Sequence, residues 1–242
     1  MKIVVGCCGI PVALSRYAAA LSAVEVQQTF YQPPGPPVLR RWREGVPSGF
    51  RFALKAWQLV THPPSSPTYR RLRTPLTGPP EAYGWFRPTP QVAQAWEATL
   101  DAARLLAAEV IVLQCPASFR PEPAHIEWLR SFASSVRRDG FVLAWEPRGA
   151  WPAQLVAALC GELALSHAVD PLAGPWLGGE VAYFRLHGRG GFRYRYTDAD
   201  LADLEARCRA ALDAGAREVW VCFNTVSMFQ DALRFRDRLR EG

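Results

Sequence analysis

Short apolar runs alternate with longer segments of helical spacing along this chain of 242 residues. Most of the runs are continuously apolar, which is typical of parallel strands that are covered on both faces. The pattern predicts eight strands, at Ile3–Gly6, Ala23–Val26, Phe50–Ala53, Val110–Gln114, Val142–Glu146, Leu165–Val169, Val181–Leu186 and Val219–Phe223.

Apolar residues at helical spacing lie between several of these strands. Such stripes run over 92–106, 126–136, 155–163 and 201–212, and a last helix is expected from about Phe229 to Arg240. Thr197 or Asp198 suits a helix N-cap, and Gly215 suits the end of the same helix. Strands that alternate with helices in this way predict an α/β, TIM-like (β/α)8 barrel as a single domain over 1–242. A doubly wound open sheet is the alternative.

Two stretches are rich in proline. Residues 33–37 predict a stiff elbow after the second strand. The segment 57–90 combines prolines with Tyr69, Arg70, Arg71, Arg73, Tyr83, Trp85 and Phe86. A loop of this length in a compact domain is often functional. The other interpretation is a surface excursion that packs its own aromatic residues.

Composition narrows the class of protein. The chain is 49% hydrophobic and 21% charged, which argues against disorder, and no apolar run approaches the roughly 18 residues of a membrane helix. Too few residues precede Cys7 for a lipoprotein signal, so we expect a soluble, cytoplasmic protein with no membrane partner. Lysine occurs only at Lys2 and Lys55, so arginine supplies nearly all of the +6 net charge. This balance favours a small anionic ligand or nucleic acid as partner, and a solvated arginine-rich surface is the alternative.

Six cysteines lie far apart without a C-x-x-C pair. Their spacing argues against a zinc ribbon or an iron–sulfur site and indicates buried thiols. The sequence leaves open whether Cys7, Cys8, Cys115 and Cys222 are free, disulfide-bonded or functional, and it leaves the oligomeric state open too.

Polar residues recur where the predicted strands end, which in a barrel is the face that carries the active site. The catalytic candidates are Glu25, Lys55, Glu146, Asp170 and His187. The candidates for substrate binding are His62, Gln114, Arg148, Arg185, Arg189 and Asn224. Because buried charges are costly unless they are paired, a purely structural role for all of these residues is the less favoured interpretation.

The chemistry of this set allows several roles. The carboxylates could form an acid/base pair. Lys55 could form a Schiff base or act as a fixed cation, and the fixed cation is favoured because Glu25 or Glu146 would keep it protonated. Site histidines are too few for a trinuclear zinc cluster, so no metal centre is predicted. One divalent cation on Glu146, Asp170 and His187 is the alternative. No cofactor is assigned.

The loop that follows the seventh predicted strand is rich in glycine, from His187 to Phe192. In many barrels the backbone amides at this place bind phosphate, and Arg189 adds positive charge. No Walker loop, G-x-G-x-x-G, G-x-S-x-G or H-E-x-x-H motif occurs. Nucleotide hydrolysis, dinucleotide redox and serine-hydrolase chemistry are therefore disfavoured.

Taken in order, these residues resemble the domain-of-unknown-function 72 family, also called YecE-like. The matching stretches are Gly6-Cys7-Cys8-Gly9, Val24-Glu25-Val26, Thr29-Phe30-Tyr31, Trp42, Pro47, Phe50, Phe52, Lys55, Thr61-His62, Leu113-Gln114-Cys115-Pro116, Phe119, Ala144-Trp145-Glu146-Pro147-Arg148, Trp151, Asp170, Tyr183 to Arg189, Tyr194 and Phe223-Asn224. The resemblance implies a TIM barrel, adds Tyr31 as a substrate-binding candidate, and names no reaction. Cys7-Cys8 stands where the family usually has Thr-Ser, Ile10 replaces a Trp, and Thr225 replaces a second Asn.

Three functions follow as hypotheses. The first is an enzyme of hydrolase or isomerase type that acts on a phosphorylated or carboxylated substrate at the strand ends. The second is nucleic-acid binding or processing by the basic, aromatic stretch 69–87. The third is a non-catalytic sensor of a metabolite or anion at the same site.

Overall fold

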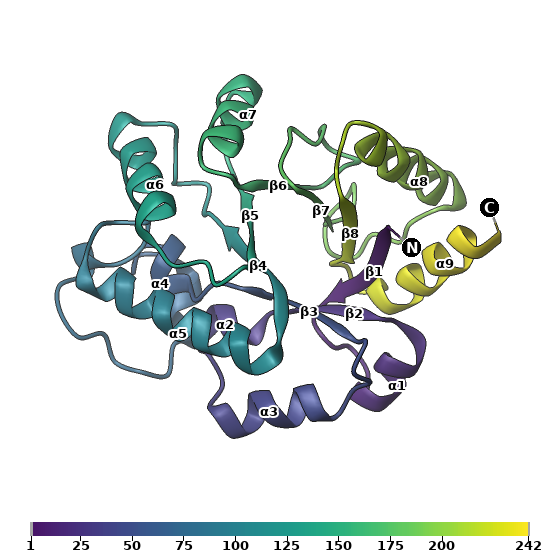
Figure 1. Cartoon of the computed structure of the whole chain (residues 1–242), viewed down its shortest axis with the longest axis horizontal. Coiled ribbons are helices and arrows are strands. Elements are labelled where there is room, and N and C mark those ends of the chain that lie inside the picture. Colours follow the sequence, from purple (N-terminus) through teal and green to yellow (C-terminus); the bar gives the residue numbers. More distant parts are fainter. Residues whose placement is uncertain (1, 242) are drawn as a thin grey trace.

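Eight parallel strands form a closed barrel in chain order in the computed structural model, which describes residues 2–241 (Figure 1). They are β1 Ile3–Cys8, β2 Ala23–Val26, β3 Arg51–Lys55, β4 Ala108–Gln114, β5 Val142–Glu146, β6 Ser166–Val169, β7 Val181–Leu186 and β8 Glu218–Phe223. β1 pairs with β8, for example Ile3 opposite Val219, and this pairing closes the barrel. The predicted (β/α)8 fold is confirmed, and the open sheet is wrong.

Two apolar layers hold the barrel together. The strand residues that point inward form a separate interior cluster of mostly small side chains, which includes Val4, Ala53, Ala144 and Ala168. Outward residues such as Leu54 and Trp145 pack against the surrounding helices. Because successive strand residues face opposite sides, every strand is buried on both faces, as its unbroken apolar run predicts.

Helices surround the strands and connect most of them (Figure 1). They are α1 Leu14–Ala20, α2 Gln28–Tyr31, α3 Pro36–Glu44, α4 Gln58–Thr61, α5 Pro90–Leu106, α6 Pro123–Ser135, α7 Ala153–Glu162, α8 Asp198–Asp213 and α9 Met228–Glu241. All five predicted helices are present, as α5 to α9. The shorter helices α1 to α4 were not predicted. Thr197 caps α8 reciprocally with Asp200, and Gly215 adopts φ 101° just beyond that helix, as expected.

The predicted elbow at 33–37 is partly helical. α3 begins at Pro36, where a proline in the first turn loses no hydrogen bond because the first amides of a helix have no partner. The preceding Gly35 is extended, so residues 33–35 are the part of the predicted elbow that is not helical.

The segment 57–90 is not a free loop. It contains α4 and two short 3₁₀ helices, at Pro67–Arg71 and Pro80–Ala82. Its return stretch lies against α4, where Gly84 N donates to Leu59 O at 2.8 Å and Phe86 N donates to Val60 O at 2.9 Å. Tyr83 and Phe86 are buried. Tyr69 and Trp85 are partly buried against the core, so all four aromatic residues proposed to stack on nucleic-acid bases pack against the protein itself, as in the alternative interpretation.

An ion-pair cluster lies at the N-terminal end of the barrel. Arg51 donates to Glu109 and to Glu218, the latter at 2.6 Å, and its guanidinium lies 4.9 Å from the centre of the Trp220 ring. The Arg51 side chain is 24% exposed. Opposite this end lies the C-terminal face, where the site candidates gather. No helix within residues 2–241 is long and apolar enough to cross a membrane.

Candidate active site

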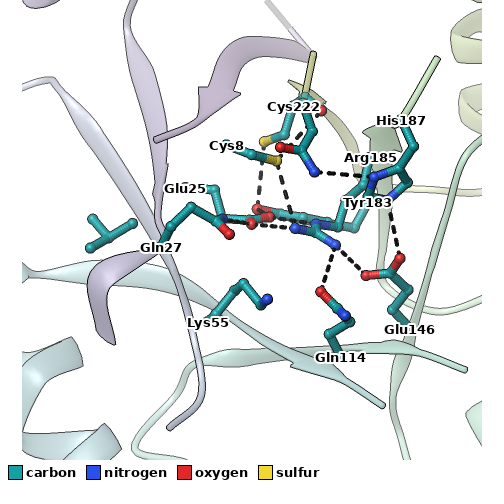
Figure 2. Close-up of polar contacts among 12 residues, drawn as sticks. Cys8, Glu25, Gln27, Lys55, Gln114, Glu146, Tyr183, Arg185, His187 and Cys222 are labelled. Atoms are coloured by element: carbon teal, nitrogen blue, oxygen red, sulfur yellow. Dashed lines mark hydrogen bonds and ion pairs between the residues drawn. The ribbon is translucent and has the colours of Figure 1, made fainter. Parts of the chain in front are cut away.

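The period of the strands brings most of the predicted site residues to one place. Glu25, Lys55, Gln114, Glu146 and Arg185 each occupy the same side of a strand as a residue of the interior cluster two positions earlier. All of them lie at or near the C-terminal ends of their strands, so they form a ring across the mouth of the barrel (Figure 2).

Arg185 is the centre of this ring (Figure 2). Its Nε and Nη2 atoms donate to the two oxygens of Glu25 at 2.9 and 2.8 Å. Its Nη1 atom donates to Glu146 and, at 3.2 Å, to Gln114. The Arg185 and Glu25 side chains are 1% and 0% exposed. A guanidinium held between two buried carboxylates is a structural clamp, so Arg185 is not available to bind a substrate anion as predicted.

The clamp sets the charge of both glutamates. Burial alone would raise the pKa of Glu25, but the charge and hydrogen bonds of Arg185 outweigh it and lower that pKa. Burial acts against Glu146 in the same way, and Arg185, His187 and Arg148 bring its pKa well below the usual range. Both side chains are therefore carboxylates at neutral pH.

Two polar residues of this clamp were missed in the sequence. Tyr183 donates its hydroxyl proton to Glu25 at 2.9 Å, and Gln27 donates to the other oxygen of Glu25. Each lies two positions from a residue that was chosen, Arg185 or Glu25, so strand periodicity was the signal that could have found them.

A second group of polar residues joins Glu146 to the outer part of the mouth. His187 Nε2 lies 3.2 Å from Glu146 Oε1. Asn224 Nδ2 lies 3.1 Å from His187 Nδ1, so this amide orients the imidazole from the side opposite Glu146. Arg148 Nε donates to Glu146 Oε1 at 3.0 Å, and Arg148 Nη2 lies 2.9 Å from His187 Nε2. The side chains of Arg148 and His187 are 39% and 28% exposed, so both can reach a ligand.

Lys55 is buried beside the clamp without a counterion. Its Nζ lies 3.7 Å from the centre of the Phe30 ring, and it makes no ion pair with any carboxylate of residues 2–241. Figure 2 accordingly draws no dashed line at this amine. Burial lowers the pKa of Lys55 to about 7, and the charge of Arg185 adds to that effect.

The expectation that a glutamate keeps Lys55 protonated is therefore wrong. Glu25 and Glu146 do act to raise its pKa, but neither pairs with it, because Glu25 is paired with Arg185, and Glu146 with Arg185 and Arg148. The Phe30 face favours the ammonium form by about 0.5–2 kcal/mol, whereas an unpaired buried charge costs several kcal/mol. Lys55 is thus divided between a charged and a neutral amine near neutral pH.

Asp170 and Arg189 do not join the ring as predicted. Asp170 accepts the backbone amides of His187 at 2.9 Å and Leu172 at 3.0 Å, so its carboxylate positions the His187 backbone. Arg189 pairs with Asp200 on α8 at 3.1 Å. The glycine-rich loop also turns inward, because Gly188 N donates to the Tyr196 hydroxyl at 2.8 Å. Its amides are partly used within the protein instead of forming an open phosphate cradle.

His62 and Tyr31 pack against Phe30, the residue whose ring faces the Lys55 amine. His62 is buried, and its ring is 4.9 Å from that of Phe30. Burial, followed by the charge of Lys55, lowers the pKa of His62 to about 3. Tyr31 lies under the guanidinium of Arg71 at 3.5 Å. These two aromatic residues lie outside the ring of charged side chains and form part of the wall of the barrel mouth.

A groove extends from Tyr31 along the molecular surface. Its volume is about 380 Å³, and it is lined by Gln28, Tyr31, Gln32, Pro33, Pro34, Gly35, Val38, Trp42, Arg71 and Arg73. The groove thus joins the elbow at 33–35 to the segment 57–90, and two arginines and two aromatic rings face it.

The mouth does not form the divalent cation site that was considered for Glu146, Asp170 and His187. Asp170 is held by backbone amides instead, and no group of three or more His, Cys, Asp or Glu residues between positions 2 and 241 is arranged to hold a metal ion. In place of a metal, Arg185 occupies the space between the two buried carboxylates.

All six cysteines are free and buried, including the four whose state the sequence left open, Cys7, Cys8, Cys115 and Cys222. Cys8 and Cys222 belong to the interior cluster below the mouth, and Arg185 Nη2 lies 3.8 Å from Cys8 Sγ. Burial raises the pKa of the Cys8 thiol well above its usual value, so this thiol is not a ready nucleophile.

Comparisons with known proteins agree with this architecture. A family model described as "Protein of unknown function DUF72" matches residues 10–242. The solved DUF72 family protein EF0366 from Enterococcus faecalis V583 is 18% identical with a TM-score of 0.77, covering 98% of this chain and 95% of that one. The DUF72 family protein TM1631 from Thermotoga maritima MSB8 is 19% identical with a TM-score of 0.74, covering 99% and 100%.

More distant solved structures share the barrel. A D-psicose 3-epimerase, solved in the presence of D-fructose, is 12% identical with a TM-score of 0.56, and the match covers 94% of this chain and 91% of that one. At this identity the likeness shows the fold alone. No curated protein matches the chain.

Proposed function

The chain belongs to the DUF72 family, whose description assigns no activity, and from that premise we propose that it is an enzyme acting on a small anionic substrate at the C-terminal barrel mouth. The reaction is of isomerase or hydrolase type, and the substrate carries a carboxylate or a phosphate. One observation carries the proposal: the His187–Glu146 pair lies beside a partly exposed guanidinium, that of Arg148.

The pair suits proton transfer. Glu146 stays ionised because its pKa is held well below the usual range, and its Oε1 faces the Nε2 atom of His187. Asn224 orients the opposite side of the same ring. A carboxylate that orients an imidazole and stabilises its protonated form is a recurring arrangement in acid/base catalysis.

The substrate anion would bind at Arg148. Of the four basic residues predicted to bind it, Arg185 is clamped, Arg189 is paired with α8 and Lys55 has no fixed charge. Arg148 offers a planar fork that suits carboxylate or phosphate, and its side chain is 39% exposed. This choice places the anion next to the imidazole of His187, which lies 2.9 Å from the Arg148 guanidinium.

We favour an isomerase because the mouth combines a proton-transfer pair with a buried amine. A hydrolase that uses two carboxylates is disfavoured because both glutamates are held by Arg185. Glycoside hydrolysis would need both carboxylates free, one as an acid and one as a base or nucleophile. Here Glu25 accepts hydrogen bonds on both oxygens and is fully buried. We place the activity in the cytoplasm, where free thiols such as these six are the rule.

A substrate panel tests the proposal. Oxo sugars, sugar phosphates and small carboxylic acids are incubated with the protein, and turnover is followed by NMR. His187→Ala, Glu146→Gln and Arg148→Met should each lower turnover by at least about 100-fold. The matched control is Arg189→Met, which removes an arginine paired away from the mouth. Unchanged turnover in His187→Ala and Glu146→Gln would contradict the assignment.

A second candidate function is binding of single-stranded nucleic acid. The groove of about 380 Å³ supports it, because arginines and aromatic rings beside each other can hold phosphates and stack bases. We expect an oligonucleotide to bind at low salt and to weaken steeply as salt rises, with Arg73→Ser reducing the salt dependence. No binding at low salt, or binding that salt does not change, would exclude this function.

Binding without turnover would instead favour a sensor. In that case phosphate or a carboxylate stabilises the protein against heat through Arg148, but no member of the panel is converted.

A further inference from the structure

The amine of Lys55 is the most unusual group at the mouth that the proposed proton transfer does not use. Lys55 ends β3, and its backbone carbonyl accepts a hydrogen bond of 2.8 Å from Thr29 at the start of α2. That contact helps to hold Phe30 of α2 beneath the amine. The side chain is therefore positioned by the fold and is only 5% exposed.

No acidic residue between positions 2 and 241 forms an ion pair with this amine. Each of the four oxygens of Glu25 and Glu146 already accepts a hydrogen bond from another residue. The contact that the structure gives the amine is the face of Phe30, which cannot accept its proton. A lysine that only stabilised the fold by charge would be expected to pair with one of the nearby carboxylates.

The surroundings favour the neutral amine more than water does, so a substantial fraction of Lys55 is neutral near pH 7. The amine is buried, and the guanidinium of Arg185 acts on it as a like charge. Desolvation beside another cation is the recognised way to activate a lysine as a nucleophile toward carbonyl carbon. The pKa of about 7 agrees with this geometry.

We propose that Lys55 forms a covalent imine with the substrate and that the substrate is therefore a small anionic oxo compound, either an oxo acid or an oxo sugar phosphate. This inference rests on the proposed function, because Arg148 binds the anionic group and His187 with Glu146 moves protons on the bound substrate.

The covalent step balances without an oxidant or reductant. The nitrogen lone pair of Lys55 attacks the carbonyl carbon, and the electron pair of the C=O double bond moves to oxygen. The two amine hydrogens leave with that oxygen as one water molecule, and a C=N bond forms. Once protonated, the imine withdraws electrons from the neighbouring carbon, so a base can remove a proton there, which is the chemistry of an isomerisation.

Reductive trapping tests the imine. The protein is incubated at pH 7 with pyruvate in one arm and dihydroxyacetone phosphate in the other, and sodium borohydride is added. Borohydride reduces an imine to a stable secondary amine, which adds the mass of the carbonyl compound less one oxygen atom. Intact mass and peptide mapping then locate the adduct, and the arm that labels identifies an oxo acid or an oxo sugar phosphate.

The chain provides its own control, because Lys2 is the only other lysine and is exposed. We expect Lys55 to be labelled about tenfold faster than Lys2, in the wild type and in Lys2→Arg alike, and Lys55→Met to lose the faster adduct. The labelling rate at Lys55 should rise through pH 7. Lack of an adduct at Lys55 with both probes, or a rate equal to that of Lys2, overturns the inference.

Lys55→Arg separates this inference from the proposed function. Arginine keeps a positive charge but cannot form an imine. If the substrate panel gives turnover and Lys55→Arg retains it in full, the imine is wrong, while the enzyme proposal still depends on His187 and Glu146. If His187→Ala and Glu146→Gln retain turnover but Lys55 is labelled, the imine stands and the proton-transfer assignment fails.

Discussion

Removing the guanidinium of Arg185 should destabilise the protein through the two carboxylates that it leaves behind. In Arg185→Met, Glu25 keeps a hydrogen bond from Tyr183, and Glu146 keeps Arg148 and His187, but both lose their buried cation. Breaking a buried ion pair by removing one partner costs about 3–5 kcal/mol. For a domain of this size that corresponds to a fall in Tm of about 6–20 °C.

Arg51→Met is the matched control. Arg51 also joins two glutamates, but it lies at the opposite end of the barrel and is 24% exposed, compared with 1% for Arg185. Ion pairs open to water are worth about 1 kcal/mol at most, so this variant should lose about 2 kcal/mol or less. Unfolding in urea at pH 8, followed by circular dichroism, gives both free energies.

The dependence on pH identifies the cause. In the wild type the pKa of Glu25 is lowered from 4.5, so its contribution to stability is full above about pH 4.5 and is lost as the pH falls from there through the depressed value. Without Arg185, burial raises the pKa of Glu25 above 4.5, so the loss is full at pH 8 and shrinks as the pH falls toward 4.5. Equal losses in the two variants, or a loss in Arg185→Met that pH does not change, would refute the reasoning.

Three further predictions concern stability. Gly84→Ala should cost about 2 kcal/mol or more, because φ is +74° and the new Cβ would lie 2.2 Å from the His62 carbonyl oxygen, while Gly49→Ala, with open space around it, should change little in the same urea titration. In His62→Gln the free energy of unfolding should fall less between about pH 6.5 and 3 than it does in the wild type. The folded wild type keeps His62 neutral over this range, in which the unfolded chain binds a proton, and an equal fall in the two proteins would contradict a buried neutral imidazole. Thr197→Ala should cost about 1 kcal/mol by removing the acceptor of the Asp200 amide, and Thr197→Ser should restore it, as thermal unfolding would show.

The fold was readable in the sequence because burial on both faces leaves a direct trace. A parallel strand covered by helices outside and by the barrel interior inside needs apolar residues throughout, so each strand appears as an unbroken run. Long helices leave a trace of period 3.6 for the same reason. The short helices α2 and α4 have four residues each, about one turn, and carry no such signal.

The sequence alone determined most of the residues that reach the mouth, because a strand that ends at the C-terminal face brings its last inward side chain there; Asp170 and Arg189 are the exceptions. Only the tertiary structure decided how these charges pair. Strands β2, β5 and β7 are far apart in the chain, and their closure into a barrel brings Arg185 between Glu25 and Glu146. Within residues 2–241 the same closure leaves Lys55 without an ion pair, since all four oxygens of Glu25 and Glu146 already accept hydrogen bonds from other residues.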